Sequence, residues 1–296
     1  RLEERGFKAV SLRGGQSREE REEIFGLIES GQAAFVIANP EILLSKAVFE
    51  KLPSLGIGHL VIDEAHCTSE WGESFRPSYL ELGRIIKSSG APLVSAFTAT
   101  ASPPVLEKIE RYIFDGEAVH RIIGNPDRPN IRYYALGALD RDMAVLEVLE
   151  RFPLPAIVFC SSREGCEQLA RFLASRPLKG KRRASVRFYH AALERMEKEA
   201  VNDWYLNSKD GILCATCAWG MGVDKSDIRT VVHRDCSPTV EAYLQESGRA
   251  GRDGGRSHAI LLFGPDDRQE LKRARTGEDR ERLEALLDYA RGTAVC

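Results

Sequence analysis

The chain has 296 residues, with 42 Lys and Arg against 44 Asp and Glu and a formal net charge of −2. Apolar residues at 43% and charged residues at 29% describe a globular protein, which excludes a disordered or collagen-like chain. The near-neutral charge excludes a histone-like protein but allows a local basic groove. No run approaches the ~20 apolar residues of a membrane span, so we expect no membrane partner.

The cysteines and the two chain ends indicate where the protein works. The seven cysteines are scattered and odd in number, which favours a reducing cytoplasm over a disulfide framework. The charged start Arg1-Leu2-Glu3-Glu4-Arg5 is unlike a secretory leader. Because the chain begins with Arg and ends on Cys296, we expect a piece of a longer protein, and the cysteines favour the cytoplasm as its location.

Short apolar runs alternate with helical patterns along most of the chain. The runs that predict buried strands are 35–38, 60–62, 93–97, 156–160, 212–215 and 230–233. Capping signals predict helix starts at a 17–20 capping box, at Ser102 before Pro103, and at a second capping box over 161–164. This alternation predicts an α/β fold with parallel sheets covered on both faces, and chemistry at the carboxyl ends of the strands.

Two breaks in the pattern divide the chain. The polar run 124–130 contains two prolines and is the best internal boundary. It separates a first lobe at 1–124 from a second lobe at 125–264. A second break at Gly264-Pro265 precedes a charged helical stretch that runs to Tyr289, which predicts a third segment over 265–296.

Acidic residues follow the strand expected at 60–62. Asp63-Glu64-Ala65-His66 places a carboxylate at the end of a buried strand, as in phosphoryl-transfer proteins that hold Mg²⁺. The adjacent acid can orient and deprotonate an attacking water, and the histidine can link the site to neighbouring elements. A helix N-terminus with two acids that favour its dipole is the alternative, and these four residues alone leave it open.

Two further segments carry polar groups suited to the same chemistry. The run 95–101 follows a strand and ends in small hydroxyl residues, which can couple the acidic site to a second domain or close a turn at Ser102. The run 245–254 places Arg249 and Arg252 three residues apart, on one side of a helical turn. Such guanidinium groups can reach a γ-phosphate across an interdomain cleft, and an arginine finger accelerates hydrolysis about 10³–10⁵-fold. The alternative is a glycine-rich surface turn with solvated arginines.

Taken together, segments 63–66, 98–100 and 245–252 resemble motifs II, III and VI of superfamily 2 helicases. The aromatic-rich segment 67–79 narrows the resemblance to the RecQ family of DNA helicases. Further segments similar to that family are Asn39-Pro40-Glu41, Asp127-Arg128-Pro129-Asn130-Ile131, Phe159-Cys160-Ser161-Ser162-Arg163, Tyr189-His190-Ala191 and Trp219-Gly220-Met221-Gly222-Val223-Asp224-Lys225. The resemblance covers nearly the whole chain.

The resemblance implies a fold and an activity. The fold is two RecA-like parallel-sheet lobes, the first of them incomplete, and the start of a helical zinc-binding subdomain. The activity is an ATP-dependent 3′ to 5′ DNA helicase that acts on single-stranded and duplex DNA in repair and recombination. ATP and Mg²⁺ are the implied cofactors, with Zn²⁺ in the full-length protein, and the oligomeric state is left open.

The resemblance also implies roles for single residues. Asp63 and Glu64 coordinate Mg²⁺ and position the hydrolytic water, within a catalytic set completed by His66, Gln245, Arg249 and Arg252, of which Arg252 is the principal finger. Thr98, Thr100, Gly222 and Asp224 bind or couple to the nucleotide. Trp71, Phe75 and Arg76 sense single-stranded DNA, since an aromatic face stacks on any base for ~1–3 kcal/mol. A place in the core is the alternative for the aromatic residues, and it suits Tyr79 better than Trp71. Cys296 stands where the first zinc ligand falls.

One expected motif is missing from this sequence. It contains no G-x-x-x-x-G-K-[ST] run, whose backbone amides and lysine cradle the phosphates. Relative to the family the chain begins after that loop, so we expect it to hydrolyse ATP barely or not at all in isolation. A non-catalytic nucleic-acid-binding module is the rival hypothesis, and the intact acids and arginines argue against it. The 71–76 loop disfavours an RNA helicase.

Overall fold

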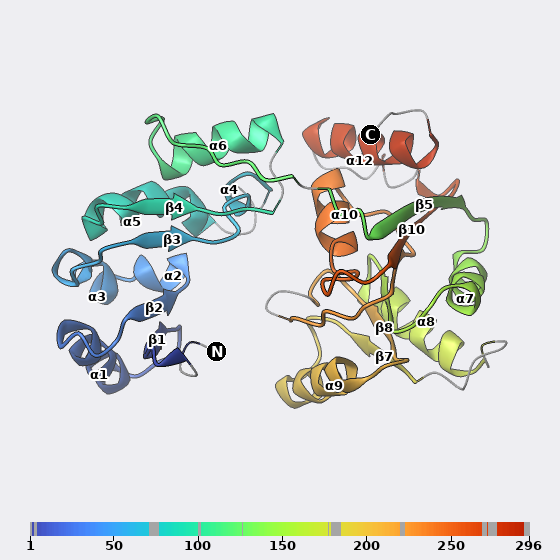
Figure 1. Ribbon diagram of the computed structural model, residues 1–296, viewed down its shortest axis with the longest axis horizontal. Helices are drawn as coiled ribbons and strands as arrows, with labels where there is room; N and C mark the ends of the chain where they lie inside the picture. The colour runs from blue at the N-terminus through green and yellow to red at the C-terminus, as the bar shows by residue number, and fades with distance from the viewer. Residues whose placement is uncertain are drawn as a thin grey trace. The chain divides into compact units, whose positions relative to one another are not determined.

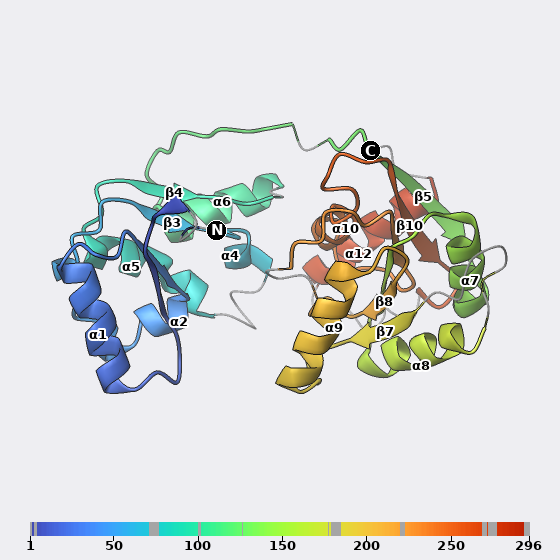
Figure 2. The same cartoon turned by 60° about the horizontal axis from the view of Figure 1, so that its bottom comes forward.

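The computed structural model describes residues 2, 5–70, 77–99, 102–125, 127–176, 178, 185–219, 223–267, 271 and 277–292. The chain divides into two compact units, Arg1–Pro126 and Asp127–Cys296, each described separately below (Figures 1 and 2). Within the described ranges, no helix is long and apolar enough to cross a membrane.

The first unit contains four short strands with helices between them. In chain order its elements are β1 (Ala9–Leu12), α1 (Arg18–Glu29), β2 (Phe35–Ala38), α2 (Pro40–Leu43), α3 (Lys46–Phe49), η2 (Leu52–Ser54), β3 (Leu60–Ile62), α4 (Cys67–Glu70), η3 (Pro77–Glu81), α5 (Leu82–Ser89), β4 (Val94–Ala96) and α6 (Pro103–Ile113). Strand β1 pairs with β2 and strand β3 pairs with β4, both in parallel. The four strands therefore form two separate two-stranded sheets.

Local signals set the starts of α1 and α6 as predicted. Ser17 caps α1 through a complete capping box with Glu20, and Ser102 is the N-cap of α6 with proline in its first turn. The apolar faces of α5 and α6 pack on β3 around Ile62, Ile85 and Ile109. Tyr79 belongs to the same cluster and is 8% exposed, which confirms its predicted place in the core.

The strands of the first unit are not buried as predicted. In β2, Phe35, Val36 and Ile37 are 43%, 41% and 58% exposed, and Val61 in the centre of β3 is 54% exposed. Strands of a parallel sheet read as apolar runs because they normally have a layer on each face. The described residues supply such a layer for only part of these two sheets, so apolar side chains that suit a sheet interior face outward.

The second unit is built on one six-stranded sheet. Its strands are β5 (Ile131–Gly137), β6 (Ala156–Phe159), β7 (Val186–Tyr189), β8 (Ile212–Ala215), β9 (Thr230–His233) and β10 (Ser257–Phe263). They lie in the order β5-β10-β9-β6-β8-β7, and every neighbouring pair is parallel. The order places the interior strands β6, β8 and β9 where all their residues are buried.

Helices cover both faces of this sheet, which confirms the predicted α/β architecture for the second unit. Val158 points to the face covered by α7 (Arg141–Arg151) and α8 (Arg163–Ala174). The adjacent Ile157 points to the other face, toward α9 (Arg195–Asn207), as the two-residue period of a strand requires. On that second face, α10 (Val240–Ser247) and α12 (Gly277–Ala290) lie next to each other (Figure 1). Both helices pack around Leu261.

The structure bears on two further predictions for the second unit, the capping box at 161–164 and the zinc-binding subdomain in the third segment. The capping box expected at 161–164 is wrong, because Ser162 is the N-cap of α8 and its side chain accepts from the amide of Gly165. The predicted third segment contributes α12, which packs on the second unit. A zinc-binding subdomain is not seen, since no group of three or more His, Cys, Asp or Glu in the described part of the chain is placed to hold a metal.

Candidate active site

The acidic segment begins where β3 ends. Asp63 and Glu64 follow Ile62 directly, and both side chains are exposed. The Asp63 Oδ1 atom accepts a hydrogen bond of 2.9 Å from the Glu64 amide. Glu64 has a φ of 52°, in the left-handed region that non-glycine residues rarely adopt and that costs on the order of 1–3 kcal/mol. The turn therefore holds two carboxylates in a strained backbone conformation at the carboxyl end of a parallel strand.

A buried histidine connects this turn to the next strand. His66 is 5% exposed, and its Nδ1 atom lies 3.0 Å from Thr98 Oγ1 and 3.3 Å from Glu64 Oε2. The backbone supports the contact, because the Ala65 amide donates to the Phe97 carbonyl across the β3–β4 pair. The structure therefore brings Glu64, His66 and Thr98 together, as expected for segments that follow adjacent parallel strands.

Several predicted site residues lie outside the described residues. They are Trp71, Phe75 and Arg76 of the aromatic-rich segment, together with Thr100, Gly222 and Cys296. The short helix α4 forms the first four residues of the aromatic-rich segment, directly after His66. Their predicted roles remain predictions.

The arginines of the second unit lie in a turn after α10, which we call the arginine loop (residues 248–255). The expectation that Arg249 and Arg252 share one side of a helical turn is wrong, because α10 ends at Ser247. The Arg249 guanidinium is half-buried and lies 5.8 Å from the centre of the Trp219 ring. Arg252 is exposed, and its Nη1 atom lies 3.4 Å from Asp224 Oδ1. The two arginines therefore face different neighbours, and Gln245 lies half-buried one turn earlier in α10.

Salt bridges and backbone bonds fix the arginine loop to the segment before β9. Arg229 Nη1 donates to Asp253 Oδ1 at 2.9 Å, and the Gly251 amide donates to the Ile228 carbonyl at 2.8 Å. The Arg229 hydrogen bonds and the Gly255 amide lower the pKa of Asp253 to about 2. The carboxylate is therefore held ionised in this contact through the neutral range.

A buried lysine anchors the segment that carries Asp224. Lys225 is 3% exposed, and its ammonium donates to the Leu206 and Ser208 carbonyls at the end of α9 and pairs with Asp227 at 2.8 Å. Burial by itself would raise the pKa of Asp227, but hydrogen bonds from Lys225 and Lys209 lower it. This full set of partners is what a buried charge needs, and it fixes the backbone next to Asp224.

Sequence reasoning missed a buried polar group beside the arginine loop. Glu246, in α10, accepts from His233 Nε2 at 2.9 Å and from Ser237 Oγ at 2.8 Å. His233 is fully buried at the end of β9 and stacks on Phe159. A glutamate beside Gln245 in the motif was the available signal. The contacts fix α10, and with it the start of the arginine loop, against the sheet.

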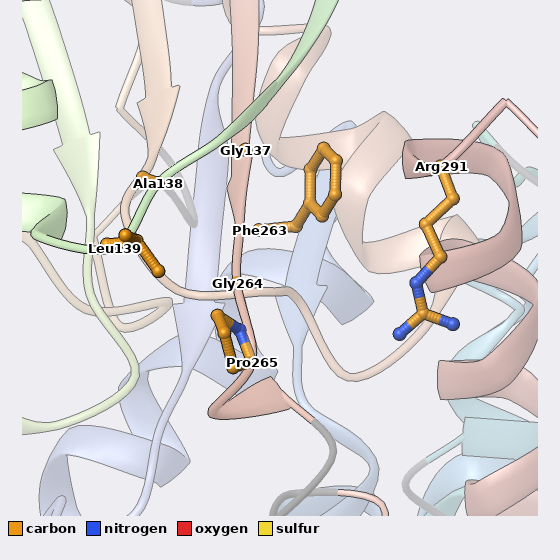
Figure 3. Close-up of a pocket in the computed structure, with 7 residues that line it drawn as sticks. All are labelled: Gly137, Ala138, Leu139, Phe263, Gly264, Pro265 and Arg291. Carbon is orange, nitrogen blue, oxygen red and sulfur yellow. The ribbon is translucent and has the colours of Figure 1, made fainter.

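A pocket of about 430 Å³ lies at the carboxyl ends of β5 and β10. Its lining residues are Gly137, Ala138, Leu139, Phe263, Gly264, Pro265 and Arg291 (Figure 3). Arg291, which follows α12, contributes its charged group. The pocket shares no residue with the acidic turn or the arginine loop, so we do not include it in the candidate site.

Two family models match the chain, one in each unit. The DEAD/DEAH box helicase model matches residues 1–109, and the helicase conserved C-terminal domain model matches residues 141–254. Among solved structures, the DUF1998 helicase MrfA bound to DNA and AMPPNP has a TM-score of 0.67 and 20% identity, covering 98% of this chain and 41% of that chain. The fold is therefore that of RecA-like helicase lobes. The acids lie within the residues matched by the DEAD/DEAH box helicase model, and the arginines lie within those matched by the helicase C-terminal model.

Curated relatives narrow the class. The chain is 39% identical over 270 residues to the probable ATP-dependent DNA helicase RecS of Bacillus subtilis (strain 168), covering 90% of this chain and 53% of that protein. It is 32% identical over 302 residues to the ATP-dependent DNA helicase RecQ of Haemophilus influenzae, covering 98% of this chain and 47% of that protein. The chain belongs to the RecQ family of helicases. It spans about half the length of these curated relatives.

Proposed function

We propose that the protein is an ATP-dependent DNA helicase that moves 3′ to 5′ along single-stranded DNA and unwinds duplex DNA. The observation that carries the proposal is the contact of His66 with Thr98 beside the Asp63-Glu64 pair. It joins two carboxylates to a neighbouring strand end, where a change in nucleotide state can pass to the rest of the protein. The relatives named as ATP-dependent DNA helicases support the same activity.

The residues present suit a divalent ion and ATP hydrolysis. Exposed carboxylates at the end of β3 are the oxygen donors that Mg²⁺ takes in nucleotide sites, and we assign Asp63 to that ion. When bound, the ion neutralises charge on the phosphate oxygens. Glu64 takes a proton from the attacking water. The water oxygen forms a bond to the γ-phosphorus as the bond between the γ-phosphorus and ADP breaks. Arg249 and Arg252 offset negative charge on the transferred phosphoryl group, in concert with Gln245.

We assign the DNA-sensing role to Trp71, Phe75 and Arg76. Their place directly after α4, which starts one residue after His66, supports a short path from DNA to the acidic turn. Thr100 and Gly222 complete the proposed nucleotide set with Thr98 and Asp224. Trp71→Ala is expected to remove most of the stimulation of ATP hydrolysis by single-stranded DNA while the rate without DNA stays unchanged.

Zinc is proposed for the full-length protein alone. Cys296 is the proposed first ligand, and a tetrahedral site needs further thiolate or imidazole ligands that the described residues do not supply. Measurement of the metal content of the native protein, with Cys296→Ser as the variant, tests this assignment.

The proposed reaction is tested with Glu64→Gln in the native protein, expressed from its whole coding frame. Loss of the general base is expected to lower DNA-stimulated kcat by about 10²–10⁴-fold while ATP binding persists. Glu22→Gln, the same change on the exposed face of α1, is the matched control. A Glu64→Gln protein with unchanged kcat contradicts the assignment.

Substrate choice and direction need separate assays. Single-stranded DNA is expected to stimulate ATP hydrolysis more than RNA of the same sequence, and a duplex with a 3′ single-stranded tail to be unwound in preference to one with a 5′ tail. Equal stimulation by RNA contradicts the DNA assignment, and preference for the 5′ tail contradicts the direction.

A further inference from the structure

The first residues of the second unit form hydrogen bonds to the backbone of the arginine loop. The Arg128 guanidinium donates three hydrogen bonds, to the carbonyls of Gly248 at 3.2 Å, Ala250 at 3.3 Å and Gly251 at 3.1 Å. Gly248 and Ala250 lie on either side of Arg249, and Gly251 directly precedes Arg252. A planar guanidinium that meets three carbonyls fixes their relative orientation in a way that a single point donor cannot. Arg128 therefore fixes the conformation of the backbone that carries Arg249 and Arg252.

Asn130, in the same segment, also donates hydrogen bonds to the backbone of the arginine loop. Its Nδ2 atom donates to the Gly251 carbonyl at 2.8 Å and to the Gly255 carbonyl at 3.0 Å, so both amide protons are used. The packing is close, because a Cβ built on Gly251 would lie 2.6 Å from Asn130 Nδ2 and 2.4 Å from the Gly255 carbonyl oxygen. Gly251 has a φ of 55°, which suits glycine. The loop is therefore held at both ends of its tightest turn.

We propose that Arg128 and Asn130 are positioning residues for ATP hydrolysis. They act through the arginine loop, by holding the backbone that presents Arg249 and Arg252, and the proposal rests on the function proposed above. Both residues follow directly on the segment that leads into the second unit. A displacement of that segment acts on the loop carbonyls, and so on the placement of the arginines.

The expected effect follows from the sensitivity of catalysis to geometry. Misplacing a catalytic group by about 1 Å can cost about 10²-fold in rate. Asn130→Asp keeps the size of the side chain, but it replaces the two N–H donors with a carboxylate oxygen that faces two carbonyls. We therefore expect it to lower the DNA-stimulated kcat at least about 10-fold, with KM for ATP changed less than about 3-fold. Arg128→Lys keeps the charge without the planar fork and is expected to fall between wild type and Arg128→Ala.

The test is a double-mutant cycle in the native protein. Steady-state kcat and KM for ATP are measured for wild type, Asn130→Asp, Arg252→Ala and the double variant, with thermal unfolding of each. Asn207→Asp is the matched control, because Asn207 Nδ2 donates to a single carbonyl at 2.8 Å on the exposed end of α9. If Asn130 acts through the loop, Asn130→Asp adds little to the loss already caused by Arg252→Ala.

The outcomes separate the positioning role from the proposed function. A double variant whose loss equals the product of the two single losses overturns the positioning role alone. So does an Asn130→Asp protein with a lowered unfolding temperature and an unchanged kcat, because that pattern shows a purely structural role. An Arg252→Ala protein with unchanged kcat overturns the assignment of Arg252, and the positioning role falls with it.

Discussion

The Nδ1 atom of His66 and the Oγ1 atom of Thr98 lie 3.0 Å apart, 32 residues from each other in sequence. The contact exists because β3 and β4 are adjacent and parallel, so the residues after each strand emerge at the same edge. This side-chain contact connects the acidic turn to the Thr98 turn, and it can be removed without changing either carboxylate.

Removing the Thr98 hydroxyl tests that contact. Thr98→Val keeps the shape of the side chain and leaves the buried His66 with one hydrogen-bonding contact fewer, which is expected to cost about 1 kcal/mol of unfolding free energy. We expect strand displacement to fall more than DNA-stimulated ATP hydrolysis, since the contact serves coupling. Thr98→Ser, which keeps the hydroxyl, is the control, and an equal fall of both activities would contradict the coupling role.

The contact of Asp224 with Arg252 is expected to matter for the reaction and little for folding. Both side chains are partly exposed, and exposed ion pairs contribute roughly 0–1 kcal/mol. Asp224→Asn is therefore expected to lower kcat several-fold while the free energy of unfolding changes by less than about 0.5 kcal/mol. Glu199→Gln breaks a comparable exposed pair in α9 and serves as the control. Unchanged kcat in Asp224→Asn would show that Arg252 needs no such orientation.

Glu246 offers the opposite case, a residue expected to matter for stability. Glu246→Ala removes the acceptor shared by the buried His233 and Ser237, and two orphaned polar groups are expected to cost about 2–4 kcal/mol. Glu246→Gln keeps an acceptor and is expected to cost less than about 1 kcal/mol. Urea unfolding followed by tryptophan fluorescence measures both, with the exposed Glu147→Ala as control. Equal losses in the Ala and Gln variants would contradict the role of the shared acceptor.

The ion pair of Asp253 with Arg229 predicts a pH dependence. The folded-state pKa of Asp253 is about 2, below its ordinary value of 3.8. A depressed acid pKa stabilises the fold above the ordinary value, and the contribution is lost as the pH falls toward 2. The difference in unfolding free energy between wild type and Asp253→Asn should therefore shrink between about pH 4 and pH 2. The same comparison in an Arg229→Ala background should lose this pH dependence, and its persistence there would refute the assignment.

Much of the fold could be predicted from apolar runs. Strands β2, β3, β8 and β9 have the bounds expected from the sequence, because each is a short apolar run between polar turns. Strands β1, β5, β7 and β10 were missed. In β7, Val186-Arg187-Phe188-Tyr189 mixes a charged residue into an edge strand, and β10 begins with Ser257 and His258 after a glycine-rich turn. Their pairing with neighbouring strands, which no local pattern shows, decides their conformation.

The candidate site was predictable in its residue types and much less so in its contacts. The acids after β3 and the hydroxyl after β4 could be predicted as site residues, because residues that follow adjacent parallel strands emerge at the same edge of a sheet. The hydrogen bonds of Arg128 to the arginine loop could not be predicted in this way, because the two segments are separated by 120 residues and more. They meet only through the order of β5 and β10 in the sheet. The prolines of the run 124–130 predict a boundary, whereas its polar side chains Arg128 and Asn130 make the contacts with the arginine loop.

The two left-handed glycines of the arginine loop differ in their tolerance to sequence drift. Gly251 has backbone and side-chain atoms within 2.6 Å of any added Cβ, whereas Gly254, with a φ of 81°, has open space around it. Asn and Asp adopt left-handed conformations more readily than other residues, so Gly254 can be replaced at modest cost. In a library of random variants selected for growth, substitutions should therefore be rare at codon 251 and tolerated at codon 254.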